Sequence, residues 1–174
     1  AALAVLLWAL LIFVVAAEVA MPWLMRAFAP GFLDEPTKFD LTVSLARITF
    51  PYLLFISLVS LAGGVLNAQH RFAAAAATPM LLNLCLIGAV FGLAPLTPTP
   101  GHALAWGVFA AGIVQGAFLF AALRRAGERL ALVRPSVGPK IRLLRRRALP
   151  VAVGAGVYQV NLFVDMIVAS FLPA

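Results

Sequence analysis

Four residues near the C-terminal end of the chain combine polar chemistry with helical spacing. Gly154, Tyr158, Asn161 and Asp165 follow one another at intervals of four, three and four residues, so a helix would carry them on one stripe. The other side of such a helix is apolar: Val157, Val160, Phe163, Val164 and Ile167. An acid at membrane depth needs a cation, a proton or a water-filled cavity, and carboxylate and amide oxygens suit hard cations. We therefore predict a Na⁺ or H⁺ coupling site at Asp165 and Asn161, with Tyr158 lining the cavity. The alternative is a hydrogen-bonded contact between helices in which Asp165 is protonated.

A second polar stripe lies in an earlier apolar segment and contains Ser57, Ser60, Gly64, Asn67 and Arg71. Small residues let helix backbones approach closely, so the two serines and the glycine predict helix packing. Asn67 and Arg71 come at the end of the segment, where a cavity or the phosphate of a lipid head group is within reach. The alternative for these two residues is simple anchoring at the membrane edge.

The motifs of covalent chemistry are missing from the sequence. It contains no phosphate-cradling glycine loop with Lys-Ser/Thr, no nucleophile elbow and no metal-binding cluster of His and Cys. The single cysteine, Cys85, lies in an apolar run and is expected to be a small buried hydrophobe. We therefore expect no enzyme and no cofactor other than a coupling ion.

Composition indicates which elements position these residues. The chain is 64% hydrophobic and 11% charged, whereas soluble domains are about half apolar and a quarter charged. Five apolar segments are each long enough to cross a bilayer, which takes roughly 20 helical residues, and an open sheet edge cannot face lipid. We predict an all-α, polytopic transmembrane bundle with spans at about residues 3–24, 45–66, 72–93, 103–123 and 149–172. Pro51 should kink the second span.

The distribution of charge predicts the orientation. Nine of the thirteen basic residues lie between Arg124 and Arg147, and such loops stay on the cytoplasmic side. Alternation then makes the turn with Arg71 cytoplasmic, and it makes the 95–101 turn and the acidic 34–40 loop external. The net charge of +7 thus reflects one loop, and nucleic-acid binding is not expected. Residues 139–147 predict a short amphipathic helix on the lipids of the inner leaflet, or else a solvated loop.

Several runs of this sequence resemble the MurJ/MviN family of the MOP exporter superfamily. The matches follow the family's order over nearly the whole chain: 48–58 (ITFPYLLFISL), 63–67 (GGVLN), 71–72 (RF), 78–83 (TPMLLN), 29–32 (APGF), 104–107 (LAWG), 159–162 (QVNL) and 169–172 (ASFL). The chain starts inside an apolar run without an initiator Met, which is expected of an internal fragment.

The resemblance implies five of the fourteen helices of a larger two-lobe transporter. Residues 1–123 would be family helices three to six of the N-terminal lobe, residues 124–147 a basic cytoplasmic linker, and residues 148–174 helix seven. Asp165 matches a position that is acidic in some members and linked there to a cation site, and Arg71 matches the family's Arg-Phe pair. The substrate-contacting arginines of the family lie largely in helices outside this chain, so none is carried over.

The function that the resemblance implies is a flippase of lipid II, the undecaprenyl-linked precursor of peptidoglycan. Such proteins lie in the bacterial inner membrane, move the lipid from the inner to the outer leaflet by alternating access, and are expected to work with cell wall synthesis proteins. A MATE-like drug or ion antiporter and a non-transporting membrane scaffold are the alternatives.

Overall fold

The computed structural model describes residues 2–128 and 139–171, with part of the side chains in the second range. Its regular elements are helices: six α-helices and two short 3-10 helices in these residues. Four helical stretches are long and apolar enough to cross a membrane, Leu3–Phe28, Pro36–Ala68, Phe72–Gly92 and Pro100–Arg125. The predicted all-α membrane bundle is therefore confirmed, with four of the five predicted spans meeting the criteria of length and composition.

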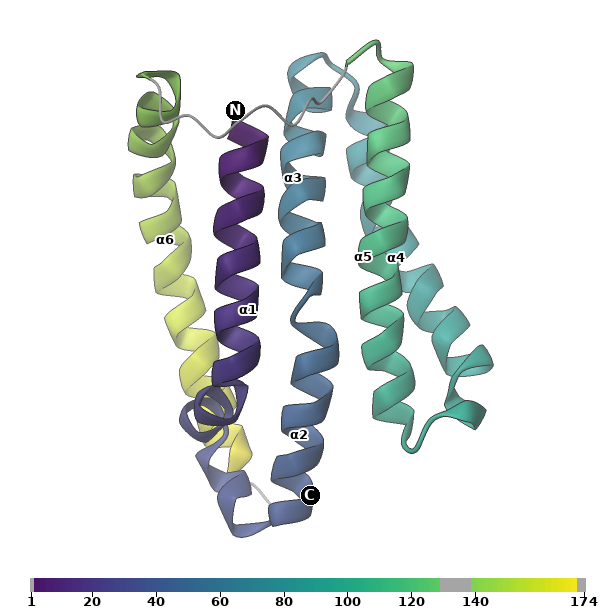
Figure 1. Ribbon diagram of the computed structural model, residues 1–174, viewed down its shortest axis with the longest axis vertical. Coiled ribbons are helices and arrows are strands. Elements are labelled where there is room, and N and C mark those ends of the chain that lie inside the picture. The colour runs from purple at the N-terminus through teal and green to yellow at the C-terminus, as the bar shows by residue number, and fades with distance from the viewer. Residues whose placement is uncertain (1, 129–138, 172–174) are drawn as a thin grey trace.

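The helices alternate in direction, so that consecutive connections lie at opposite ends of the bundle (Figure 1). Helix α1 (Ala2–Phe28) runs away from the end at which the chain begins, and the 3-10 helix η1 (Pro30–Asp34) turns the chain at the far end. The chain returns through α2 (Pro36–Thr49) and α3 (Tyr52–Ala68), turns into α4 (Phe72–Gly92), and passes through η2 (Ala94–Leu96) into α5 (Pro100–Arg125). The last helix, α6 (Pro139–Ser170), lies beside α1.

The second membrane segment is broken in the middle, as Pro51 predicted. Helix α2 ends at Thr49, Phe50 and Pro51 form a turn, and α3 begins at Tyr52. Pro51 has no N–H for the carbonyl of Arg47, four residues earlier. The predicted start of this segment, near residue 45, was wrong. The helix begins at Pro36, because proline suits a first helical position and charged residues outside the bilayer do not end a helix.

Two helices end at the same side of the bundle with the same hydrogen-bonded cap, in which a left-handed residue reverses the chain. At the end of α5, Gly127 has φ +82°, and Glu128 N–H donates to the carbonyl of Leu123 at 3.0 Å. At the end of α3 the left-handed residue is His70, with φ +60°. Arg71 N–H there donates to the carbonyl of Leu66 at 3.0 Å. Glycine adopts this conformation without steric cost, whereas histidine does not.

Helices α3, α4 and α5 pack through small residues. A Cβ at Gly112 of α5 would lie 2.8 Å from Cβ of Phe55, and one at Gly107 would lie 2.7 Å from Cβ of Ala89. The buried cluster between α3 and α5 consists of Val59, Ala62, Leu66, Leu119 and Leu123. Close approach of this kind drives association inside a bilayer, where lipid tails are as apolar as the side chains.

Helix α6 is continuous from Pro139 to Ser170, so residues 139–147 form its first turns and not a separate helix. Pro150 inside it removes only one backbone donor, which a helix can accommodate. Residues 129–138 of the predicted basic linker lie outside the described residues. The far end of α6 is fixed at η1, where Gly31 N–H donates to Oγ of Ser170 at 3.1 Å.

Candidate functional site

The polar stripe of α6 faces away from α1. The ring of Phe163 stacks on Phe28 of α1 with centroids 5.0 Å apart, which fixes the side of α6 that packs. Asn161 and Asp165 lie two residues before and two residues after Phe163, so each is about 160° from it around the helix. Both side chains are exposed, and in the described part of the chain Asp165 forms no ion pair. The cation site stays a prediction, and the side chain of Tyr158 lies outside the described residues.

Asn67 and Arg71 lie at the opposite end of the bundle from Asp165, and they belong to the α3–α4 pair of helices. Helix α6 packs on α1 and η1, whereas Asn67 and Arg71 belong to the end of α3 and the turn into α4. In Figure 1, α1 stands between α6 and α3. The structure therefore does not bring these two residues together with Asp165, and any site that includes all three would need further elements.

Two of the small residues on α3 that were predicted to pack, Ser60 and Gly64, do not pack within the described part of the chain. Both are exposed, and a Cβ at Gly64 would meet no described atom within 4 Å. Together with Asn67 and Thr78 they line a groove of about 340 Å³. Ser60 donates its hydroxyl to the carbonyl of Ile56 in its own helix at 2.8 Å, as serines in apolar helices commonly do. This face of α3 is open, and Gly63 makes the close contact, with Ala75.

A buried polar network at membrane depth joins three helices. Gln115 of α5 is 1% exposed. Its Nε2 donates to the carbonyl of Thr78 in α4 at 2.7 Å, and its Oε1 accepts from the hydroxyl of Tyr52 in α3 at 3.1 Å. Pro79 deprives the carbonyl of Ala75 of its helical donor, and the hydroxyl of Thr78 donates to that carbonyl at 2.8 Å. Polar groups are thus paired where an unpaired one would be costly.

Sequence reasoning missed this network. The usable signals were the Thr-Pro pair in α4 and the tyrosine directly after Pro51. Neither signal identifies Gln115 as the partner, because Thr78 is 37 residues and Tyr52 is 63 residues away from it in the sequence.

Glu18 of α1 is a second acid at membrane depth. Its Oε1 is buried and has no hydrogen-bond partner among the described residues. A contact between the rings of Phe13 and Phe50, with centroids 6.0 Å apart, sets the antiparallel register that brings Glu18 and Arg47 to one level. This acid therefore lies beside the break in the second segment and away from the polar stripe of α6.

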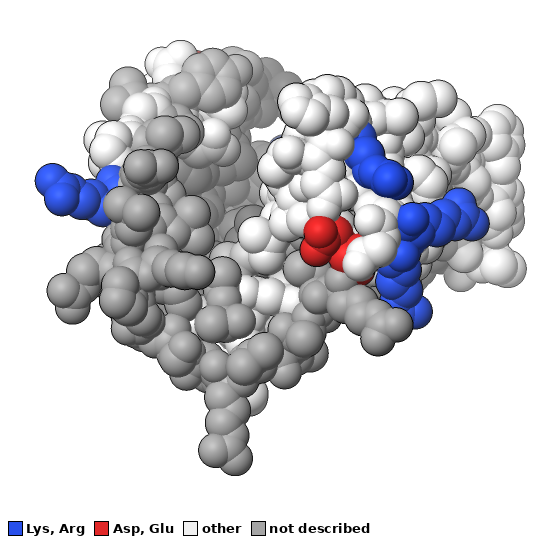
Figure 2. Space-filling view, turned by 90° about the horizontal axis from the view of Figure 1, so that it is seen from above, with Lys and Arg blue, Asp and Glu red and all other residues white. Residues whose placement is uncertain are grey.

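Charge separates between the two ends of the bundle. Arg71, Arg124, Arg125 and Arg146 are exposed at the end where α3, α5 and α6 have their connections, and Figure 2 shows blue side chains on both sides of that end. The opposite end carries Asp34, Glu35 and Asp40 together with Arg26 and Lys38, and Lys38 pairs with Glu35 at 3.6 Å. This is the separation that the orientation prediction requires.

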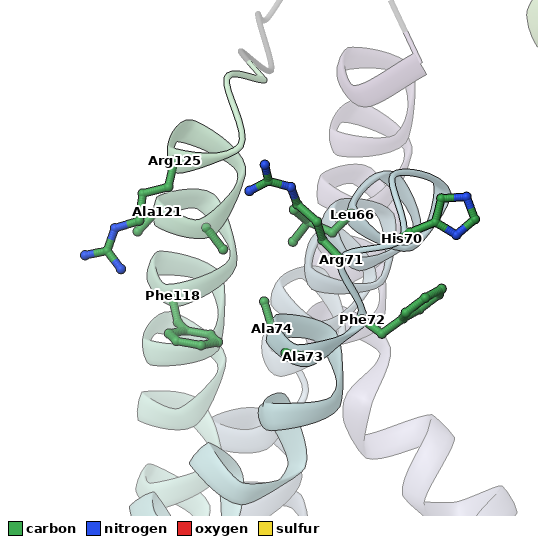
Figure 3. A pocket seen from close by; sticks show the side chains of 10 residues that line it. Leu66, His70, Arg71, Phe72, Ala73, Ala74, Phe118, Ala121 and Arg125 are labelled. Carbon is green, nitrogen blue, oxygen red and sulfur yellow. The ribbon is translucent and has the colours of Figure 1, made fainter.

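One groove at the basic end lies between the α3–α4 turn and α5, and we call it the α4–α5 groove (Figure 3). Its volume is about 730 Å³. Its walls are apolar except at the mouth, where Arg71, from the α3–α4 turn, points toward α5, and Arg125, at the end of α5, points to the other side of that helix. The lining residues are Leu66, His70, Arg71, Phe72, Ala73, Ala74, Phe118, Ala121, Ala122 and Arg125.

Comparison with known proteins identifies the family. A family model described as "Lipid II flippase MurJ" matches residues 1–174. A "Probable lipid II flippase MurJ" of Rhizobium meliloti (strain 1021) is 42% identical over 171 residues, which cover 95% of this chain and 32% of that protein. A similar protein of Rhizobium tropici, with the same name, is 42% identical over 172 residues, 95% of this chain and 32% of that protein.

A "Lipid II flippase MurJ" of Burkholderia cenocepacia is 33% identical over 173 residues, which cover 97% of this chain and 33% of that protein. The chain spans about a third of the length of the curated relatives it matches. With the helical membrane architecture and the match over every residue, this chain belongs to the lipid II flippase MurJ family.

Proposed function

We propose that this chain is part of a flippase that moves lipid II from the inner to the outer leaflet of the bacterial inner membrane. The observation that carries the proposal is the family match over residues 1–174. The helices long and apolar enough to span a membrane support a location in the membrane, and the basic end supports an orientation with that end in the cytoplasm. The reaction is translocation by alternating access, and it breaks no covalent bond.

The helices of this chain serve the cycle in two ways. Helices α3, α4 and α5 are joined by the Gln115 network and by close glycine contacts, so they move as one packed body. Helix α6 has its contacts with α1 and η1 and presents Asn161 and Asp165 outward. A second lobe, which the longer relatives have room for, would meet that polar face. Cell wall synthesis proteins that consume lipid II on the outer leaflet would be its partners.

The test uses cells that depend on the full-length protein. Depletion should lower the fraction of lipid II that an externally added, membrane-impermeant enzyme can modify in spheroplasts, while total lipid II stays constant or rises. Re-expression of the wild type should restore that fraction. An unchanged accessible fraction after depletion would contradict the proposal.

We assign the coupling ion to Asp165 and Asn161. The Asp165→Asn variant of the full-length protein should transport lipid II with a weaker dependence on Na⁺ or on pH, and Asp165→Glu, which keeps the charge, should retain most of that dependence. Identical ion dependence in wild type and Asp165→Asn would remove the ion site from the account without affecting the flippase assignment.

A further inference from the structure

Helix α6 is attached to the rest of the bundle mainly at one end. Among the α6 side chains that the structure describes, Ser170, at the end of the helix, is the one that is buried, and it is 5% exposed. In contrast, α5 has buried residues from Ala103 near its beginning to Leu123 near its end. The attachment of α6 is therefore concentrated where this helix meets η1, at the acidic end of the bundle that we predict to be external.

The contact at Ser170 is polar and very close. Gly31 N–H in η1 donates to Oγ of Ser170 at 3.1 Å, and the Ser170 hydroxyl donates to the carbonyl of Ile167 at 2.7 Å. A Cβ at Gly31 would lie 2.6 Å from the carbonyl carbon of Ser170 and 2.9 Å from the backbone nitrogen of Phe171. No side chain fits in so short a gap, so the two segments dock only because residue 31 is a glycine.

A second contact lies about two helical turns deeper. The rings of Phe28 in α1 and Phe163 in α6 stack with centroids 5.0 Å apart and planes inclined by 6°. Phe163 lies seven residues before Ser170, so the two contacts together cover about 10 Å of α6. We call the pairs Phe28–Phe163 and Gly31–Ser170 the α6 end contact.

We propose that the α6 end contact is a latch, which closes the external end of the bundle and opens when the transported lipid leaves toward the outer leaflet. The inference rests on the proposed function, because alternating access requires contacts at one side of the membrane that separate during the cycle. One hydrogen bond and one ring stack are few enough interactions for a bound ligand or ion to shift the equilibrium.

The fit at Gly31 favours two discrete states over a gradual movement. Packed interfaces of this kind are either docked or apart, because a partly docked arrangement loses both the hydrogen bond and the close packing. A permanent anchor for α6 is the other use of the same contacts. It would remain closed throughout transport, and this difference decides the experiments.

The first experiment measures access to Ser170 in the full-length protein with Cys85→Ala and Ser170→Cys. A membrane-impermeant maleimide is added outside spheroplasts. Gly31→Ala should raise the labelling rate at least tenfold, because the added Cβ prevents docking. The matched control is Gly92→Ala in α4, where a Cβ would meet no atom of the described residues within 4 Å, and it should leave the rate unchanged.

Phe171→Cys, the neighbouring position, reports whether the reagent reaches this end of the protein. Phe171 is 65% exposed, so its labelling rate should be the same with Gly31, with Gly31→Ala and with Gly92→Ala. If Ser170→Cys stays as protected in Gly31→Ala as it is with Gly31, while Phe171→Cys reacts, the latch is overturned.

The second experiment locks the contact and measures transport. Full-length protein with Cys85→Ala, Phe28→Cys and Phe163→Cys is treated with a short, reducible thiol cross-linker and reconstituted in proteoliposomes. The cross-linked protein should translocate lipid II at least tenfold more slowly, and reduction should restore the rate. Each single cysteine variant, treated in the same way, should keep its rate.

The outcomes separate the latch from the flippase assignment. An unchanged rate of translocation in the cross-linked protein would identify a permanent anchor and overturn the latch, while the flippase assignment would stand. Absence of translocation by the wild type and by the reduced protein would contradict the proposed function, and the latch with it.

Discussion

The hydroxyl of Tyr52, one residue after the break in the second membrane segment, donates a 3.1 Å hydrogen bond to Oε1 of Gln115 in α5. Gln115 uses its amide to bond the carbonyl of Thr78, next to Pro79 in α4. Pro51 and Pro79 each disturb a helix, and the residue next to each proline thus forms a hydrogen bond with the same buried glutamine. This arrangement connects the irregular parts of α3 and α4 to α5.

Removal of the glutamine amide should loosen the three-helix body. Interhelical hydrogen bonds in membranes contribute about 0.6 kcal/mol each on average, so Gln115→Leu, which removes two, should lower the free energy of unfolding by about 1 kcal/mol. Unfolding of the full-length protein by sodium dodecyl sulfate, followed by circular dichroism, measures this. The control is Asn83→Leu, an exposed amide in α4, which should leave stability unchanged. A loss of equal size in both variants would contradict the role of the network.

The two glycines four residues apart in α5 should respond in opposite directions to alanine. A Cβ at Gly112 would lie 2.8 Å from Cβ of Phe55, whereas one at Gly116 would meet no atom within 4 Å in the described part of the chain. Gly112→Ala should therefore destabilise the protein by about 1–3 kcal/mol through overpacking. Gly116→Ala should stabilise it by about 0.5–1 kcal/mol, because alanine is the better helix former. The same unfolding titration applies, and an equal shift of one sign in both variants would refute the packing described.

The caps of α3 and α5 give a prediction from backbone conformation. His70 has φ +60°, and glycine is free of the steric cost there. His70→Gly should raise the free energy of unfolding by about 1 kcal/mol. The gain is reduced because the variant loses the edge contact between His70 and Phe72. Gly127→Ala, at φ +82°, should lower it by about 1 kcal/mol. If His70→Gly lowers the free energy of unfolding by as much as Gly127→Ala does, His70 does not have the left-handed conformation described.

The orientation of the bundle can be tested by labelling. In a full-length protein whose Cys85 is replaced by alanine, a cysteine at Thr37 should react with a membrane-impermeant maleimide added outside spheroplasts. A cysteine at Arg124 should react only after the membrane is opened, because basic ends stay in the cytoplasm. Both positions are exposed, so access depends on the side of the membrane. The reverse pattern would invert the topology.

Sequence reasoning located the helices well because hydrocarbon imposes a length of about 20 apolar residues on each span. It also placed the break at Pro51, since proline acts locally. It did not find the start of α2 at Pro36, because hydropathy marks where the membrane ends and not where the helix ends. Charged residues such as Lys38 and Asp40 therefore fell outside the predicted segment although they are helical.

The candidate sites were less predictable because they depend on contacts between distant residues. The spacing of Asn161 and Asp165 correctly gave one helix face, but the described part of the chain does not show what that face contacts. Gly112 and Gly116 have the same local sequence signal, and only the position of Phe55 distinguishes them. Arg71 and Arg125 are 54 positions apart in sequence, and the groove that they share exists only when α4 packs on α5.

The most direct test of the central claim is translocation of lipid II by the purified full-length protein in proteoliposomes. Fluorescent lipid II is placed in one leaflet, and its arrival in the other is followed by an impermeant quencher, with a labelled phosphatidylglycerol of matched chain length as the reference. The account predicts that the protein speeds the movement of lipid II well above that in protein-free vesicles and leaves the reference lipid unchanged. Movement of lipid II at the protein-free rate, or equal acceleration of both lipids, would contradict it.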